Sequence, residues 1–206
     1  MTTWLHEQRM DAVHAAISAC GAESVLDIGC GDGPLLIRLI SDPRIRRIVG
    51  IDLSAEALRR LRVLLSEVPE HIRRKAELVH RSMDALGSEL SGFDAAVLVE
   101  TIEHIDPDHL TRVERAVFQK VRPTTVVITT PNADFNPLLG VPPHRFRHPD
   151  HRFEWGRLKF RSWAEGIGRR NGYAVSLADL AGSHPVLGGA SQMALFSITC
   201  SSPDDG

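Results

Sequence analysis

Two carboxylates and an imidazole stand close together in the middle of the chain, in the run Glu100-Thr101-Ile102-Glu103-His104. If a helical turn begins here, the spacings i, i+3 and i+4 place Glu100, Glu103 and His104 on one face. In a cleft, such a group either shares a cation or shifts the pKa values of its members. Oxygen and nitrogen ligands together suit Mn²⁺, Fe²⁺, Co²⁺ or Zn²⁺, and Mg²⁺ less well. The same spacing is also typical of a solvated helix face, so its place in the fold has to separate the two interpretations.

A second source of ligands is the long segment 131–158, which has no regular periodicity and is rich in proline, histidine, arginine and aromatic residues. Loops of this length are uncommon in compact domains unless they carry a function. His144, His148 and His151 all lie in it, and one of them could complete a cation site. The remaining histidines have no such context and are expected at the surface or in packing: His6, His14, His71, His80, His109 and His184.

The same loop holds candidates for contacts with a nucleic acid. Arginines suit phosphate groups, and the loop offers Arg145, Arg147 and Arg152. Aromatic rings can stack on a base or pack beneath the loop, and packing is the favoured interpretation for Phe146, Phe153 and Trp155. Thr130-Pro131-Asn132 is interpreted first as the turn that leads into the loop.

A glycine cluster, residues 29–33, follows an apolar run that ends in Asp27-Ile28. Glycines let the backbone approach a ligand that any Cβ would hold away. Two carboxylates here, Asp27 and Asp32, would repel the pyrophosphate of a dinucleotide but attract the cationic amino-acid end of S-adenosylmethionine. Asp52, at the end of the next apolar run, is placed to accept hydrogen bonds from ribose hydroxyls.

Short apolar runs alternate with helical periodicity along the chain, which predicts an α/β fold with a mostly parallel seven-stranded sheet and helices on both faces. In such a sheet the carboxyl ends of the strands form the ligand crevice, and both groups of residues above directly follow strand ends. The predicted strands are 25–28, 48–51, 76–80, 93–99, 125–130, 173–177 and 193–200, and the predicted helices are 5–20, 35–40, 55–68, 110–120 and 159–170.

Length and composition favour a single domain, residues 1–206, with 131–158 as a long active-site loop and 201–206 as a frayed tail. The 24 Lys and Arg residues nearly balance the 26 Asp and Glu residues, which excludes a broadly basic nucleic-acid surface. Three distant cysteines form neither a disulfide framework nor a thiolate zinc site. With no signal peptide and no apolar run of membrane-spanning length, we expect a cytoplasmic protein.

The glycine segment 25–33 resembles the first motif of class I methyltransferases, and Asp52 resembles their acidic second motif. A more specific resemblance, covering essentially the whole chain, is to the Hen1 family of RNA 3′-terminal 2′-O-methyltransferases. Its signs are the start Leu5-x-Glu7-Gln8-Arg9, the cluster Glu100-x-x-Glu103-His104-Ile105, Thr130-Pro131-Asn132, Phe146-Arg147-His148, Asp150-His151-x-Phe153-Glu154-Trp155, Phe160 and Trp163.

This resemblance implies a Rossmann-like methyltransferase domain that binds S-adenosylmethionine, an RNA with a free 2′,3′-diol at its 3′ end, and Mn²⁺ or Mg²⁺. The implied cation ligands are Glu100, Glu103, His104 and His151. For the cofactor, it implies contacts from Asp27, Gly29, Gly31, Asp52, Ser82, Met83 and Asp84.

The implied chemistry suits these residue types. A cation shared by both terminal hydroxyls would acidify the 2′-OH, and His104 is the candidate acceptor of its proton. The product would protect RNA 3′ ends, in small-RNA stabilisation or in RNA repair, where partner proteins of either process are expected.

Two alternatives stay open. One is a generic, metal-independent small-molecule O- or N-methyltransferase in which Glu103 and His104 act as acid and base. The other is a non-catalytic module that binds RNA ends. An NAD oxidoreductase is disfavoured by the carboxylates of the glycine turn.

Overall fold

The computed structural model describes residues 4–199. The predicted tail 201–206 and Cys200, the predicted end of the last strand, lie outside the described residues. The described chain forms a seven-stranded sheet in the order β3-β2-β1-β4-β5-β7-β6, in which β7 pairs antiparallel with both of its neighbours and the other pairs are parallel. This is the Rossmann-like fold of class I methyltransferases, as predicted. The strands are β1 (Ser24–Ile28), β2 (Arg47–Asp52), β3 (Ala76–His80), β4 (Ala95–Val99), β5 (Thr125–Pro131), β6 (Tyr173–Leu180) and β7 (Ser191–Ile198).

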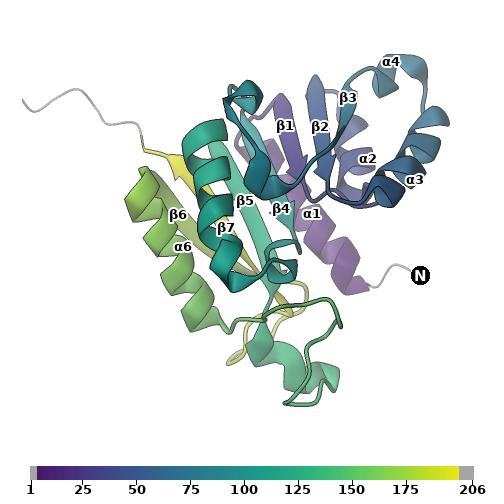
Figure 1. Ribbon diagram of the computed structural model, residues 1–206. Helices are drawn as coiled ribbons and strands as arrows, with labels where there is room; N and C mark the ends of the chain where they lie inside the picture. Colours follow the sequence, from purple (N-terminus) through teal and green to yellow (C-terminus); the bar gives the residue numbers. More distant parts are fainter. Residues whose placement is uncertain (1–3, 200–206) are drawn as a thin grey trace, which may run out of the picture.

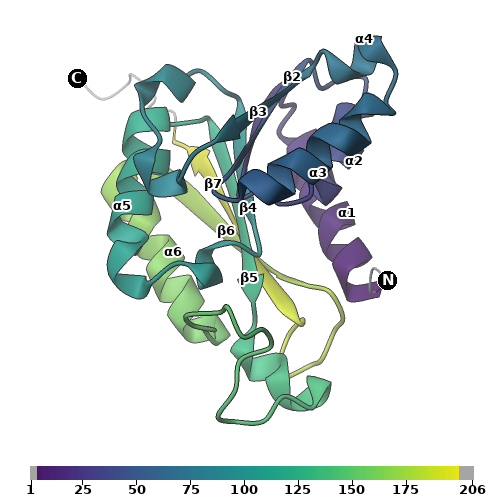
Figure 2. The ribbon, with the colours of Figure 1, turned by 45° about the vertical axis from the view of Figure 1, so that its right-hand side comes forward.

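Helices cover both faces of the sheet (Figures 1 and 2). On one face lie α1, α2 and α3, which share a buried apolar cluster with β1, β2 and β4. On the other face lie α5 and α6, with a second cluster that includes Phe118, Phe160 and Phe196. The helices are α1 (Trp4–Ala19), α2 (Pro34–Ile40), α3 (Ala55–Ser66), α4 (Glu70–Arg73), α5 (Leu110–Glu114) and α6 (Arg157–Asn171).

A local sequence signal accounts for the start of helix α3. Ser54 caps α3, because its side chain accepts a hydrogen bond from the amide of Ala57 over 3.1 Å. Strands β1, β4 and β5 are buried almost throughout, as strands covered on both faces must be. The core of the sheet therefore fixes where these strands end, and the residues that follow them meet at one edge.

The structure departs from the prediction at several elements. The short helix α4 was not predicted, and α5 continues as a π-helix over Arg115–Val121. The loop 131–158 is not wholly irregular, because a 3₁₀ helix occupies Ala133–Leu139. Figure 2 shows the rest of the loop folding back beneath the carboxyl end of β5. Within the described residues, no helix is long and apolar enough to cross a membrane.

Candidate active site

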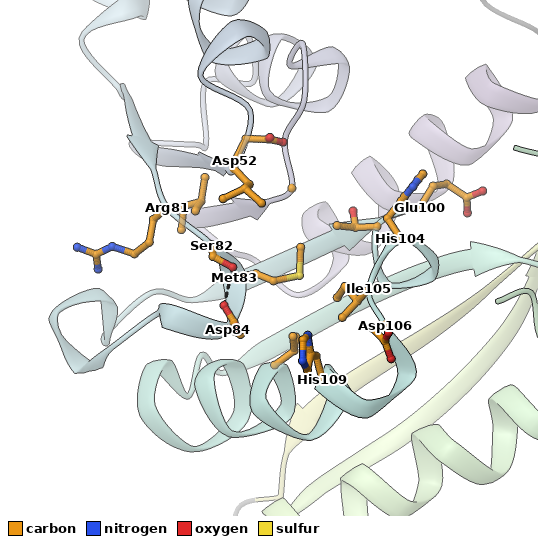
Figure 3. A pocket seen from close by; sticks show the side chains of 15 residues that line it. Asp52, Arg81, Ser82, Met83, Asp84, Glu100, His104, Ile105, Asp106 and His109 are labelled. Carbon is orange, nitrogen blue, oxygen red and sulfur yellow. Dashed lines mark hydrogen bonds between the residues drawn. The ribbon is translucent and has the colours of Figure 1, made fainter. Parts of the chain in front are cut away.

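Two cavities open at the carboxyl ends of the parallel strands, and Gly29 and Glu100 line both of them. The larger, about 480 Å³, is drawn in Figure 3, with Asp52 and Ser82 on one side and Glu100 and His104 on the other. The smaller, about 260 Å³, lies between α1 and the glycine turn. Because they adjoin at two shared residues, the two cavities can hold two parts of one elongated ligand.

Gly29 has to be a glycine at this junction. Its φ is +78°, a left-handed conformation that side chains disfavour, and an added Cβ would stand 2.3 Å from Cγ2 of Thr101. The turn therefore brings bare backbone to the wall between the two cavities. Gly31 is also left-handed, with φ +54°, and its amide donates to Asp52 Oδ2 over 2.7 Å.

Asp27 is a buried carboxylate in the wall of the smaller cavity. Its Oδ2 has no hydrogen-bond partner. Burial, reinforced by the charge of Asp52, raises the pKa of Asp27 to about 7. A buried acceptor with no donor is a place where a cationic group of a ligand would be stabilised.

Asp52 and the residues after β3 shape the larger cavity. The Asp52 carboxylate is held by two backbone amides, from Gly31 over 2.7 Å and from Ser54 over 2.7 Å, which leaves one lone pair on each oxygen for a ligand. Ser82, Met83 and Asp84 all line this cavity, and the Ser82 hydroxyl donates to Asp84 (Figure 3). The structure thus places all three predicted cofactor contacts in the wall of this cavity.

The prediction that Glu100, Glu103 and His104 share one helical face is wrong. Glu100 has a left-handed backbone, with φ +49°, and the turn that follows is a 3₁₀ helix over Ile102–His104. Three residues per turn separate Glu103 from His104 by a third of a revolution, so Glu103 is buried and His104 is exposed. The two side chains reach the site from different sides of the turn.

Glu100 is anchored by three neighbours. Its carboxylate accepts hydrogen bonds from Thr129 over 3.1 Å and Ser191 over 3.3 Å, and it pairs with Arg9 of α1 over 3.2 Å. Burial raises the pKa of Glu100, while the Arg9 charge opposes that shift. In the structure, therefore, the N-terminal helix supplies the counter-charge for this carboxylate.

Glu103 is fully buried, and only one of its carboxylate oxygens has a partner. Oε2 accepts a hydrogen bond from the Thr130 hydroxyl over 2.9 Å, whereas Oε1 has none. Burial, and then the charge of Glu100, hold the pKa of Glu103 well above its ordinary value. A buried carboxylate oxygen with no donor is a position at which a cation would be stabilised.

Three imidazoles gather beside this carboxylate turn. Ligand atoms of His104, His148 and His151 all lie within 4.8 Å of one another, and the His104 and His151 ring centroids are 4.8 Å apart. Burial, followed by the charges of His151 and His148, lowers the pKa of His104. Two predicted ligands, His104 and His151, are thus brought together, with His148 as a third imidazole. The carboxylates of Glu100 and Glu103 stand outside this compact group.

The loop that carries His148 and His151 is pinned to the carboxylate turn. The amide of Arg152 donates to the backbone carbonyl of Glu103 over 2.7 Å. Phe153 and Trp155 are buried and stacked, with ring centroids 4.2 Å apart, so they pack the loop as predicted. Phe146 does not pack in this way, because 47% of it is exposed.

Arg147 is not available as a phosphate contact, contrary to its prediction as one. Its guanidinium donates to the carbonyls of Ala190, over 2.6 Å, and Asn132, and to Oδ1 of Asn136 over 2.5 Å. Arg145 and Arg152 are exposed and keep that possibility. Asn132, predicted first as part of a turn, is also buried and donates to the carbonyls of Leu187 and Gly189, each over 2.8 Å.

We expect Arg147→Met to lower the free energy of unfolding by roughly 2–4 kcal/mol, because several buried acceptors lose a charged donor at once. Arg145→Met, two residues away and exposed, is the matched control and should change it by less than about 0.5 kcal/mol. Chemical denaturation measures both values. Equal changes in the free energy of unfolding for the two variants would show that the hydrogen bonds of Arg147 do not stabilise the fold.

Several site residues were missed by the sequence argument. His6 and His109, expected at the surface or in packing, line the smaller and larger cavities respectively. Arg9 was part of a resembling motif, but nothing in its spacing joined it to Glu100. For His109 a signal did exist, because it lies a few residues beyond the carboxylate cluster at a strand end.

Comparisons with known proteins agree with this architecture. A family model described as a methyltransferase domain matches residues 25–124. A small RNA 2′-O-methyltransferase from Rattus norvegicus is 37% identical over 202 residues, which cover 93% of this chain and 50% of the relative. This chain thus spans about half the length of that curated relative.

Two solved structures are also similar. The methyltransferase domain of a bacterial Hen1, CtHen1-CN, superposes with a TM-score of 0.85 at 33% identity, over 94% of this chain and all of that one. A small RNA methyltransferase HEN1 superposes with a TM-score of 0.86 at 30% identity, over 98% of this chain and 27% of that one. Both similarities extend across sheet, helices and loop together.

Proposed function

This chain belongs to the Hen1 family of small RNA 2′-O-methyltransferases, and from that membership and the site geometry we propose that it methylates the 3′ end of an RNA. The methyl group would pass from S-adenosylmethionine to the 2′-hydroxyl of the 3′-terminal nucleotide, with a divalent cation in the site. One observation carries the proposal. His104 lines the larger cavity and also belongs to the three-imidazole cluster, so the cavity proposed for the cofactor and the imidazoles proposed for the cation meet at one residue.

The residues around the two cavities fit S-adenosylmethionine. The partnerless Oδ2 of Asp27 would accept from the cationic amino group, and the bare backbone at Gly29 and Gly31 would let that end of the molecule approach. Asp52 would accept from the ribose hydroxyls, and Met83 and its neighbours would enclose the adenine. The shared wall of the cavities would then face the sulfonium, between the two ends.

The donor set also fits a divalent cation. We assign it to Glu100, Glu103, His104 and His151, on the ground that Glu103 Oε1 is buried without a donor and that the imidazoles lie within ligand reach of one another. When bound, the cation supplies Lewis acidity toward the terminal ribose hydroxyls. His148 is a further imidazole that this assignment leaves for substrate contact.

The chain's own groups then divide the work. The lowered pKa of His104, caused by burial and by His151 and His148, leaves a neutral imidazole at neutral pH. Its single lone pair can bind the cation or, while the other three ligands hold the cation, accept the proton of the 2′-hydroxyl. Thr130 fixes the Glu103 carboxylate, and the backbone bond from Arg152 fixes the loop against it. Positioning by these contacts supplies the alignment that methyl transfer needs.

Binding of S-adenosylmethionine should release a proton below pH 7. With a pKa of about 7, Asp27 is about nine-tenths protonated at pH 6, and a cationic ligand group lowers that pKa by favouring the carboxylate. Calorimetry at pH 6, in buffers of different ionisation enthalpy, should show release of close to one proton, and almost none at pH 8.5. Asp27→Asn should release none at either pH. Equal release by the wild type and Asp27→Asn at pH 6 would exclude Asp27 as the source.

A chelation experiment separates the proposal from a generic small-molecule methyltransferase. Labelled methyl transfer to a short RNA should disappear after exhaustive chelation and return with Mn²⁺. Undiminished transfer after chelation would favour the metal-independent alternative. Failure to bind S-adenosylmethionine at all would favour a non-catalytic module instead.

A further inference from the structure

Glu154 is a buried carboxylate to which the proposed reaction gives no part. Its side chain is 1% exposed, and three donors converge on it. Oε1 receives His151 Nδ1 over 2.6 Å and the amide of Arg147 over 2.7 Å, and Oε2 receives Asn136 Nδ2 over 2.6 Å. Each carboxylate oxygen is therefore an acceptor in this network.

The neighbouring bonds fix which atoms donate. Arginine can only donate, so the Asn136 oxygen must face the Arg147 guanidinium, 2.5 Å away, and its NH₂ must face Glu154. The Arg147 amide is likewise a donor and nothing else. With both oxygens of Glu154 committed as acceptors, the Nδ1 of His151 has to carry the hydrogen.

This commitment determines what the rest of the His151 ring can do. A neutral imidazole with its hydrogen on Nδ1 has its lone pair on Nε2. That ring lies 4.8 Å from the His104 centroid and 5.6 Å from that of His148. Glu154 thus leaves His151 with one lone-pair nitrogen for the cluster.

The Glu154 carboxylate is itself held rigidly. Asn136 belongs to the 3₁₀ helix Ala133–Leu139, and Arg147 ties the loop to the carbonyls of Asn132 and Ala190. These anchors lie on separate segments of the chain, around the lower end of the sheet in Figure 2. The carboxylate cannot easily follow the imidazole if the ring turns, so it defines the ring's orientation.

We propose that Glu154 is a positioning residue that fixes the tautomer and orientation of His151 and thereby sets the affinity of the proposed cation site, to which His151 belongs, for a divalent cation. This inference rests on the proposed function, because it needs the cluster to bind a cation. Carboxylates that orient ligating histidines in this way typically change metal affinity by about 10- to 100-fold when removed.

The first test uses the wild-type protein without metal. Histidine-selective ¹⁵N NMR should show His151 with its hydrogen on Nδ1, whereas a free imidazole in water favours Nε2. Glu154→Ala should lose this signature. A wild-type His151 that carries its hydrogen on Nε2 would overturn the assignment, whatever any variant does.

The second test is calorimetric titration with Mn²⁺, without RNA or cofactor. Glu154→Ala should weaken binding by about 10- to 100-fold. Asn136→Ala is the matched control, because it removes one of the two other donors to Glu154 and keeps the bond to His151. It should retain the Nδ1–H signature and affinity within about threefold of wild type. Equal losses in the two variants would mean that Glu154 only holds the loop together, and would overturn the proposal.

A double variant that restores the hydrogen bonds distinguishes a lost positioning role from misfolding. In Glu154→Gln the new NH₂ group faces the NH₂ of Asn136, and two donors cannot form a hydrogen bond. Adding Asn136→Asp supplies an acceptor for that NH₂ group, while the remaining oxygen at position 154 still accepts from His151. The double variant should recover the tautomer and most of the Mn²⁺ affinity lost in Glu154→Gln. If wild type binds Mn²⁺ and Glu154→Ala binds it equally well, only the positioning role fails. If wild type binds no Mn²⁺, the cation part of the proposed function fails instead.

Discussion

Replacing Glu103 by glutamine is expected to reduce methyl transfer to RNA by roughly 10³-fold, since Lewis-acid assistance amounts to several kcal/mol and each 1.4 kcal/mol is tenfold in rate. Glu103 presents the buried, partnerless Oε1 that we assign to the cation. Glutamine has nearly the same shape, and its carbonyl can still accept from Thr130. The variant therefore removes the charge and leaves the packing.

The stability of Glu103→Gln distinguishes lost chemistry from lost folding. Because burial and Glu100 hold the pKa of Glu103 well above its ordinary value, a neutral side chain suits this position when no cation is bound. Without cation, the variant should unfold at the same temperature as wild type or higher, and Mn²⁺ should no longer raise that temperature. Glu67→Gln, at an exposed position, is the control and should retain full activity. Full activity in Glu103→Gln would remove Glu103 from the cation site.

An RNA that ends in a 3′-deoxynucleotide should be methylated at least about 100-fold more slowly than its normal counterpart, as is typical when a site built for a hydroxyl meets an analogue without it. Both vicinal hydroxyls of a terminal ribose can serve as ligands in the proposed site, and an internal ribose has only one free. Initial rates of label transfer at saturating S-adenosylmethionine measure the effect.

Competition separates binding from chemistry in that experiment. The 3′-deoxy RNA should still compete with normal RNA, though more weakly, because phosphate contacts would not depend on the 3′-hydroxyl; the exposed Arg145 and Arg152 are the candidates for them. Equal methylation rates for the two RNAs would rule out recognition through both oxygens. They would leave the 2′-hydroxyl as the only ribose hydroxyl on which methylation depends.

The sheet, and the residues that line the two cavities at its carboxyl edge, were predictable from the sequence. Strands such as Ala95–Val99 consist of apolar residues and are buried on both faces, which makes such runs distinctive. Asp52 could be placed because it ends the strand that follows the glycine turn, which is where this kind of fold positions a ribose-binding carboxylate. All seven cofactor positions that were predicted lie in the walls of the two cavities, from Asp27 to Asp84.

The carboxylate turn was less predictable, because its geometry involves tertiary contacts. Glu100 has a left-handed backbone, and its carboxylate accepts hydrogen bonds from Thr129 and Ser191, which lie far away in the sequence. An i, i+3, i+4 argument assumes a regular helix and fails where a strand ends in a 3₁₀ turn. Likewise, no local pattern shows that Arg147 faces inward, to three acceptors of its own chain, while Arg145 faces solvent.

The near-neutral charge of the chain also takes on a sharper meaning. Charge balance excluded a broad basic surface, and the structure now commits one of the three loop arginines to internal bonds. A protein that recognises one terminal ribose through a ligand cluster needs few phosphate contacts. The arrangement of the loop is consistent with recognition of an RNA end rather than of its interior.

The position of the transferred methyl group is the sharpest test of the proposal that this protein methylates the 3′-terminal ribose of RNA. The protein, Mn²⁺, labelled S-adenosylmethionine and a short RNA are incubated, and the RNA is then oxidised with periodate, which cleaves only a free 2′,3′-diol. The fraction of RNA ends resistant to periodate should rise in step with the label incorporated. Label on RNA whose ends stay fully sensitive to periodate would contradict it, because the methyl group would then lie elsewhere.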